Sequence, residues 1–196
     1  MTVERSTHWR PTDTEADPDP VPAGEAEDAW AKAAREILID VAGTYHRLID
    51  RTDLAAQVQE VSGIHSSRNP HYWLSRVLAQ VAAVTVVDGE PPLTALVVHR
   101  QTGAVGADYD EVLRLTGADP ITDDVAREKH AAQARMECYR WAGATMPASG
   151  GHAALSPRLD QRIVRDRKRA RDEAAPTVCP TCFMTIPPTG VCDNCD

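Results

Sequence analysis

The hydrophobic period of the chain changes at Leu93-Thr94-Ala95-Leu96-Val97-Val98, a run bounded by Pro91-Pro92 and by Gln101-Thr102-Gly103. An apolar, β-branched run between such breakers is typical of a β-strand. The residues Ala104-Val105-Gly106 would return as a short antiparallel partner. We therefore expect a small β-hairpin over residues 93–106, with its turn at the glycine.

Three helical patterns precede this predicted hairpin. Apolar residues recur at three and four positions from about Glu25 to Tyr45, which predicts a first helix. A second helix is expected from Thr52, its predicted N-cap, to Gly63. Pro70 suits the first turn of a third helix, which stops before Asp88-Gly89. Three helices followed by a hairpin is the element order of a winged helix, whose third helix enters the DNA major groove.

The pattern after the hairpin is again helical. We expect a short helix over residues 109–115 and a long helix from Thr122, its predicted N-cap, to Trp141. Gly150-Gly151 marks a linker. Ser156-Pro157 opens a further helix that reaches about Glu173.

The C-terminus holds Cys179-Pro-Thr-Cys182 and, nine residues later, Cys192-Asp-Asn-Cys195. Two Cys-x-x-Cys pairs at this separation supply the four thiolates of a closed, structural zinc site. The segment Ile186–Gly190 would reverse the chain between them. Few apolar residues lie in this tail, so a Zn²⁺ ion would have to stabilise it. The alternative is two disulfides or a redox pair.

These patterns predict a mainly α fold with a small β-hairpin. It comprises a winged-helix-like domain, long C-terminal helices and a small zinc ribbon. The expected domain boundaries are a disordered acidic N-terminal arm over 1–28, the winged-helix-like domain with its C-terminal helix over 29–145, a linker and basic helix over 146–178, and the zinc ribbon over 179–196.

Charge is distributed unevenly along a chain whose net charge is −8. Residues 1–28 carry eight acidic and two basic side chains, whereas Pro157–Arg171 carries seven basic and two acidic ones. Guanidinium groups on one face of a helix can neutralise phosphates and release counterions. Four arginines of this helix recur at spacings of four, three and four, and we predict that they contact DNA: Arg158, Arg162, Arg165 and Arg169. The alternative is a solvated, salt-bridged linker.

Two further groups of residues suit a DNA interface. The third helix would present polar side chains of the kinds that read base edges, whereas the turn of the hairpin would reach a phosphate. The predicted contacts of the third helix are Arg68, Asn69, His71 and Arg76. Those of the hairpin turn are His99 and Arg100. The alternative is a solvated helix face without a ligand.

Three segments resemble the winged-helix domain of DNA alkyltransferases and alkyltransferase-like proteins: Thr52–Ala55, Trp73–Leu78 and Pro92–Arg100. The resemblance implies a DNA-binding fold in which His99 and Arg100 match the His-Arg that follows the reactive cysteine of that family. Val98 occupies the position of this cysteine, so the resemblance does not imply alkyl transfer. The segment Gly89–Gly106 is also similar to poorly characterised bacterial domains, some attached to restriction-type nucleases, and this again implies DNA as partner.

The sequence gives no positive sign of an enzyme, a membrane protein or a secreted protein. It has no glycine-rich phosphate loop and no nucleophile elbow. It also has no apolar run long enough to span a bilayer and no secretory signal. Four of the five cysteines belong to the predicted zinc motif, a usage that favours the reducing cytoplasm.

The sequence therefore predicts a cytoplasmic, non-enzymatic protein that binds double-stranded DNA in regulation, defence or a mobile element. One alternative is a protein-interaction adaptor that docks through the zinc ribbon and the winged-helix surface. Another is a catalytically silent sensor of modified bases, suggested by Val98. Steep salt dependence of binding would favour DNA contact over an apolar docking surface.

Overall fold

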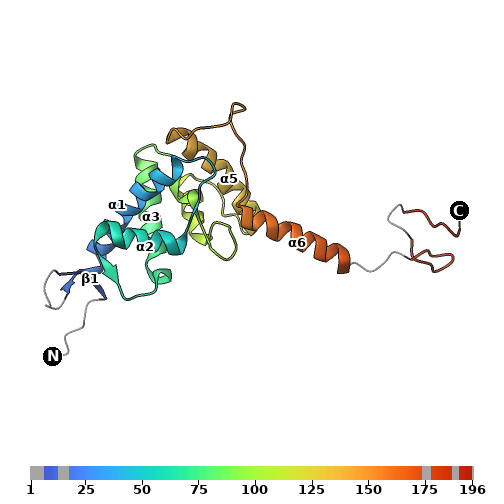
Figure 1. The fold of residues 1–196 in the computed structure, drawn as a ribbon, viewed down its shortest axis with the longest axis horizontal. Helices are drawn as coiled ribbons and strands as arrows, with labels where there is room; N and C mark the ends of the chain where they lie inside the picture. Colours follow the sequence, from blue (N-terminus) through green and yellow to red (C-terminus); the bar gives the residue numbers. More distant parts are fainter. Residues whose placement is uncertain (1–6, 13–17, 174–177, 187–189, 196) are drawn as a thin grey trace. The chain divides into compact units, whose positions relative to one another are not determined.

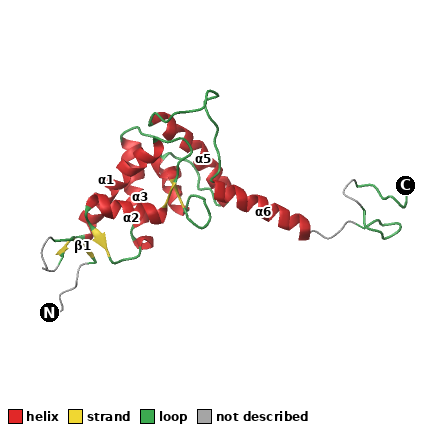
Figure 2. Cartoon of the chain, in the orientation of Figure 1, coloured by secondary structure: helices red, strands yellow, loops and turns green. Residues whose placement is uncertain are grey.

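Figure 1 shows the computed structural model of the chain, which describes residues 7–12, 18–173, 178–186 and 190–195. The chain divides into two compact units, Met1–Leu159 and Asp160–Asp196. The described residues are mostly helical, with a few short strands (Figure 2). Among them, no helix combines the length and the apolar character that crossing a bilayer requires.

Three helices build the main core of the first unit: α1 (Ala23–Ala42), α2 (Arg51–Ser62) and α3 (Leu74–Val87). Two tryptophans join them, because Trp30 of α1 and Trp73, just before α3, are buried with ring centroids 4.3 Å apart. The indole N–H of Trp30 donates a hydrogen bond to the carbonyl of Ile64, at 2.9 Å. The aliphatic face of each helix packs around this pair, as the sequence periods predict.

The N-termini of the second and third helices differ from their predicted positions. Asp50, and not Thr52, caps α2, because its carboxylate accepts the backbone N–H groups of Thr52 and Asp53. A single 3-10 turn, η1 (Pro70–Tyr72), precedes α3, so Pro70 opens this turn and not the α-helix itself. The predicted C-terminal limits are confirmed: Gly63 follows α2 in the left-handed conformation, and α3 ends before Asp88.

The predicted hairpin over residues 93–106 is wrong. Most of the apolar run forms a 3-10 helix, η2 (Leu93–Leu96), and only β5 (Val97–Val98) is a strand. This strand pairs in parallel with β3 (Ile49–Asp50), and not with the segment that follows it. The run is buried on every side and has no polar alternation, and such a run cannot be assigned to strand or helix from its period. The predicted second strand at Ala104–Gly106 is absent from this described segment, and the chain forms a turn there. In this turn, the N–H of His99 donates to the Ala104 carbonyl at 2.8 Å.

An antiparallel sheet at the N-terminus overturns the predicted disorder of residues 1–28 where these are described. It consists of β1 (His8–Arg10), β2 (Asp19–Pro20) and β4 (His65–Ser66), in the order β2-β1-β4. The ring of His8 packs edge-on against Trp30, with centroids 5.2 Å apart, and its Nδ1 lies 2.9 Å from the Ser66 hydroxyl. Acidic residues and prolines dominate this segment, but its aromatic residues supply enough apolar contact to order it. Residues 1–6 and 13–17 of the predicted arm lie outside the described residues.

The remaining elements of the first unit form a second, smaller hydrophobic cluster. They are η3 (Ala107–Tyr109), α4 (Asp110–Leu115) and α5 (Asp124–Trp141), and the start of α6 (Pro157–Glu173) also belongs to the first unit but contributes no residue to this cluster. Asp123, and not Thr122, caps α5 by accepting the N–H of Ala126 at 2.7 Å. The first unit therefore extends beyond the predicted domain of 29–145 at both of its ends.

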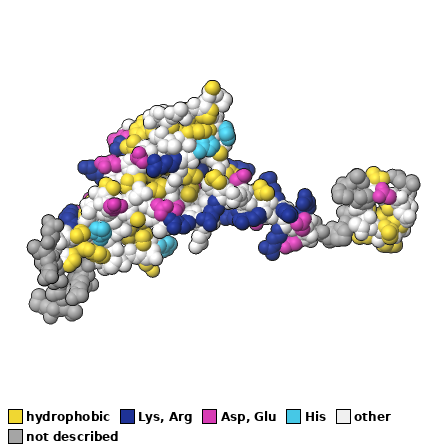
Figure 3. All heavy atoms as spheres, in the orientation of Figure 1, with side chains coloured by type: hydrophobic (Ala, Val, Ile, Leu, Met, Phe, Trp, Pro, Cys, Tyr) yellow, Lys and Arg dark blue, Asp and Glu magenta, His cyan; other side chains and the backbone are white. Residues whose placement is uncertain are grey.

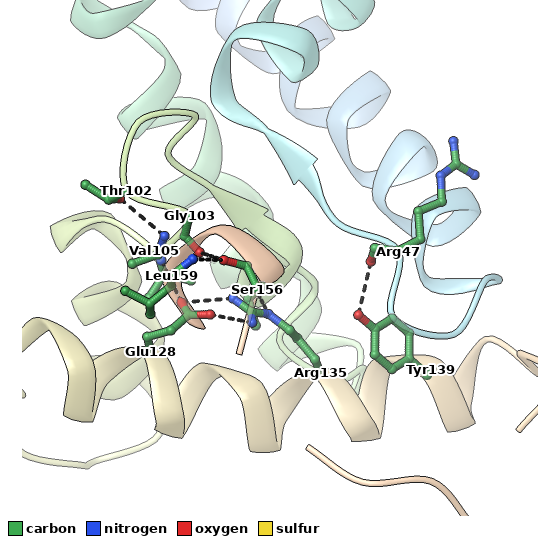
Figure 4. A network of polar contacts seen from close by, with 11 residues as sticks. Arg47, Thr102, Gly103, Val105, Glu128, Arg135, Tyr139, Ser156 and Leu159 are labelled. Atoms are coloured by element: carbon green, nitrogen blue, oxygen red, sulfur yellow. Dashed lines mark hydrogen bonds and ion pairs between the residues drawn. The ribbon is translucent and has the colours of Figure 1, made fainter. Parts of the chain in front are cut away.

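A buried ion pair connects α5 to the η2 segment and to the turn that follows β5 (Figure 4). The carboxylate of Glu128 and the guanidinium of Arg135 form a two-pronged pair, with N–O distances of 2.6 and 3.0 Å. Glu128 also accepts the backbone N–H of Val105, and Arg135 donates to the carbonyl of Ala95. Both side chains are at most 2 % exposed, so this network fixes loops that have little regular structure.

The first turn of α6 is anchored on the turn that follows β5, also visible in Figure 4. The hydroxyl of Ser156 donates to the carbonyl of Gly103 and accepts the backbone N–H of Leu159. Gly103 has a φ of +70°, and a side chain there would collide with Ser156. Ser156 thus caps α6 from a buried position, which agrees with the predicted helix start.

Candidate functional site

The four cysteines of the second unit lie close together. Their sulfur atoms are within 4.8 Å of one another, so the cluster could hold a metal ion. The Sγ–Sγ distance is 3.8 Å between Cys179 and Cys195 and 3.5 Å between Cys182 and Cys192. None of the four forms a disulfide. Four sulfur ligands within this range suit a soft, four-coordinate metal.

The local backbone explains why the first pair of cysteines converges. The N–H of Phe183 donates to the carbonyl of Cys179, and the N–H of Cys179 donates to the carbonyl of Met184, both at 2.8 Å. Val178 and Thr185 pair as an antiparallel bridge on either side of this turn. The result is a tight loop that presents two sulfur atoms in the same direction. We call residues 178–186 and 190–195 the cysteine module.

Backbone donors prepare one of these sulfurs for metal binding. The backbone N–H groups of Cys182 and Thr181 hydrogen-bond the sulfur of Cys179 and lower the pKa of this thiol to about 6. The neighbouring sulfur of Cys182, by contrast, raises the pKa of Cys195 to about 11. A metal cation would relieve this crowding, because it favours all four thiolates together. The predicted reversal at Ile186–Gly190 lies partly outside the described residues.

A cleft of about 640 Å³ lies in the first unit, between the N-terminus of α2, the η1 turn and the turn that follows β5. Most of the residues that line it are polar by type: Arg51, Thr52, Asn69, Pro70, His71, Leu74, His99, Arg100, Gln101 and Thr102. Four of the six residues predicted here to contact DNA therefore share one cleft: Asn69, His71, His99 and Arg100. The other two, Arg68 and Arg76, are not part of its lining.

The positions of the predicted third-helix residues differ from expectation. Arg68 and Asn69 precede any helix, and His71 lies in the η1 turn, where the side chain of Asn69 accepts its backbone N–H. Only Arg76 lies on α3, and its guanidinium is occupied by Glu27 and by the carbonyl of Tyr72. The prediction that these residues share the polar face of one helix is therefore wrong.

Acidic partners balance the cations of the cleft. Arg100 pairs with Asp50 and Asp53, at 2.8 and 2.5 Å. Arg51 pairs with Asp108 at 2.5 Å and donates to the hydroxyl of Ser75. The cleft therefore offers hydrogen-bonding groups without a large excess of positive charge.

The surroundings of His99 favour its neutral form. Burial lowers the pKa of His99, and the positive charge of nearby Arg51 lowers it further. The imidazole is therefore neutral near pH 7 and presents one donor and one acceptor.

The basic helix is placed as expected, and its cations face solvent. Leu159 is the one buried residue among those of α6. Arg158 donates to the carbonyl of Arg100, beside the cleft, and Arg169 pairs with Glu173. Among the described residues, Arg162 and Arg165 have no ion pair. Figure 3 shows dark blue side chains gathered along this helix.

Sequence reasoning missed several residues that shape the cleft. Arg51 and Thr52 line it because the β3–β5 pairing brings the start of α2 beside the turn after β5. Asp108 reaches Arg51 from η3, 57 residues further along the chain. Each of these contacts joins segments that are distant in sequence, so no local sequence pattern predicts them.

In comparisons with known proteins, no protein family, no curated protein and no solved structure matches this chain. The resemblance to the winged-helix domain of alkyltransferases therefore stays a prediction from the sequence.

Proposed function

We propose that this protein binds DNA without catalysing a reaction, and that α6 supplies the contacts to the phosphates. The observation that carries this proposal is the exposed series of arginines on α6, in a chain whose net charge is −8. An acidic protein attracts nucleic acid only through a local basic surface. Arg162 and Arg165 are available for such contacts, because no carboxylate pairs with them in the described part of the chain.

The cleft of the first unit supports base reading in this proposal. Asn69, His71 and Gln101 line it with amide and imidazole groups, which bond to base edges in the grooves. Arg158 lies beside it through its bond to the carbonyl of Arg100. Since the cations of the cleft are paired, we assign phosphate neutralisation to α6 and hydrogen bonding to the cleft.

The metal in this proposal is one structural Zn²⁺ ion, held by Cys179, Cys182, Cys192 and Cys195. Four thiolates leave no open coordination position, so the ion would stabilise the fold of the cysteine module and supply no reaction chemistry.

The proposal is tested by comparing two variants that each lose three positive charges, one of them from α6. The variant Arg158→Gln/Arg162→Gln/Arg165→Gln is compared with Arg10→Gln/Arg47→Gln/Arg114→Gln, whose arginines pair with carboxylates on the surface. We expect the α6 variant to lose duplex affinity and to reduce the slope of log affinity against log salt by roughly one per arginine. Equal affinity and equal slope in the two variants would contradict the phosphate role of α6.

A second candidate function, a protein-interaction adaptor, is favoured by one observation. The C-terminal end of α3 exposes three valines, Val84, Val86 and Val87, at 45, 42 and 84 %. An apolar patch of this kind suits a protein partner better than a phosphate backbone. Binding that changes little with salt would support the adaptor, because apolar contacts release no counterions.

A further inference from the structure

Phe183 has an unusual backbone conformation for its residue type. Its φ is +58°, in the left-handed region, which is strained for a residue with a bulky side chain. It is the single phenylalanine of the chain, and it is 78 % exposed. Burial therefore does not compensate the strain. Such an outlier points to a role outside the fold itself.

The backbone that carries the Phe183 ring is held by hydrogen bonds. Phe183 directly follows the ligand Cys182, and its N–H is fixed to the carbonyl of Cys179. The bridge between Val178 and Thr185 closes the same loop. The aromatic side chain is thus presented to solvent by a short loop that a bound metal would hold rigid.

The cysteine module exposes further apolar side chains. Met184 is 60 % exposed, Val178 is 54 % exposed and Val191 is 48 % exposed. These side chains belong to the same module, whose described residues include one charged side chain besides the cysteines, that of Asp193. An exposed flat ring, in a module that exposes other apolar side chains, offers a surface for another flat, uncharged group.

The residues that precede the module in the chain indicate which flat group this is. The last turns of α6 carry four exposed cations, Arg167, Lys168, Arg169 and Arg171, of which the last two pair with Glu173 and Asp172 at the surface. Basic side chains together with an exposed aromatic ring are the combination that binds single-stranded nucleic acid, because the ring stacks on a base and the cations neutralise the backbone. In a duplex, the faces of the bases are covered by their neighbours. A stacking residue therefore selects unpaired bases.

We propose that Phe183 is a stacking platform for unpaired bases, so that the cysteine module recognises single-stranded nucleic acid. This inference rests on the proposed function, since α6 supplies the charge in both. It adds a second class of ligand, a strand with exposed bases, to the duplex assigned to α6 and the cleft.

The experiment uses the full chain loaded with Zn²⁺ and compares Phe183→Gly with Phe183→Trp. Glycine relieves the left-handed strain, so this variant should hold the metal at least as well as the wild type while lacking a ring. Tryptophan keeps an aromatic face. The metal content of each variant is measured first, which separates a lost ring from a lost fold.

Affinity is then measured for a thymidine strand of about ten nucleotides and for a duplex of the same length. We expect Phe183→Gly to bind the single strand about ten- to a hundredfold more weakly, with unchanged duplex affinity, and Phe183→Trp to bind both like the wild type. Wild-type affinity of Phe183→Gly for the single strand would overturn the inference and leave the ring to a protein partner. Failure of the wild type to bind either nucleic acid would instead overturn the proposed function.

Discussion

Removal of the Glu128 carboxylate should destabilise the first unit strongly. Glu128 is 0 % exposed, and its two oxygens satisfy the guanidinium of Arg135 and the backbone N–H of Val105. In Glu128→Leu, the charge of Arg135 stays buried at 2 % exposure, and the carbonyl of Ala95 is its remaining acceptor among the described residues. Breaking a buried pair from one side costs about 3–5 kcal/mol, because the remaining charge is uncompensated.

This cost is a large part of the whole stability of a domain, which is about 5–15 kcal/mol. For a chain of this size, a loss of 3–5 kcal/mol lowers Tm by roughly 6–20 °C, since each kcal/mol corresponds to about 2–4 °C. The double variant Glu128→Leu/Arg135→Met removes both charges and leaves apolar groups of similar volume. It should cost much less than Glu128→Leu alone, about 0–2 kcal/mol.

The assay is urea unfolding followed by far-UV circular dichroism, for the wild type, both single variants and the double variant. The coupling free energy of the cycle should be large, because the two residues share hydrogen bonds. A cost below about 1 kcal/mol for Glu128→Leu would refute the reasoning, since it would mean that Arg135 finds another partner or reaches water. Additive costs in the double variant would refute it as well.

Three further predictions concern titration, helix capping and the metal. Burial, followed by the charge of Arg68, lowers the pKa of His8 below its usual 6.5. The unfolded chain therefore takes up this proton before the folded protein does, and stability should fall as the pH is lowered through about 6.5. The urea midpoint of the wild type should drop in this window more than that of His8→Gln. Asp50→Ala removes the acceptor of two N–H groups of α2 and should cost about 1–2 kcal/mol in urea unfolding, whereas Asp53→Ala should cost less, a ranking that equal costs would contradict. Cys182→Ser should lose the bound metal, measured by elemental analysis, and leave the urea transition of the first unit in place; retained stoichiometric metal would rule out the four-sulfur site.

The helices could be predicted because their signals are local. Trp30 and the apolar residues of α1 repeat at helical spacing, and glycine ends α2 where the sequence indicates. The four-cysteine cluster was predictable for the same reason, because a two-residue gap brings each pair together within one turn. The caps were off by one or two residues, since Asp50 and Asp123 compete with the neighbouring threonines.

The strands could not be predicted because their partners are distant in sequence. Val97 pairs with Ile49, and His8 pairs with Ser66, so neither pairing follows from a turn signal. The run around Val97 is buried throughout, so it shows no alternation of polar and apolar residues that would identify it as a strand.

The charged residues of α5 were equally hard to place. Charged residues are ordinarily expected at the surface, which would place Glu128 and Arg135 in solvent. Their mutual pairing instead offsets the desolvation cost of burying both charges. The cleft depends on these same long-range contacts, because the Glu128 network positions the turn that carries His99 and Arg100. The sequence could thus name four residues of the cleft without indicating that they meet.

The most direct test of DNA binding is selection from a pool of random duplex DNA by the full chain loaded with Zn²⁺, at low and at physiological salt, followed by sequencing of the retained DNA. We expect retention at low salt through α6 and an enriched motif at physiological salt through the cleft. Retention at low salt without a motif would contradict base reading by the cleft. No retention at either salt would contradict the central claim and favour the adaptor.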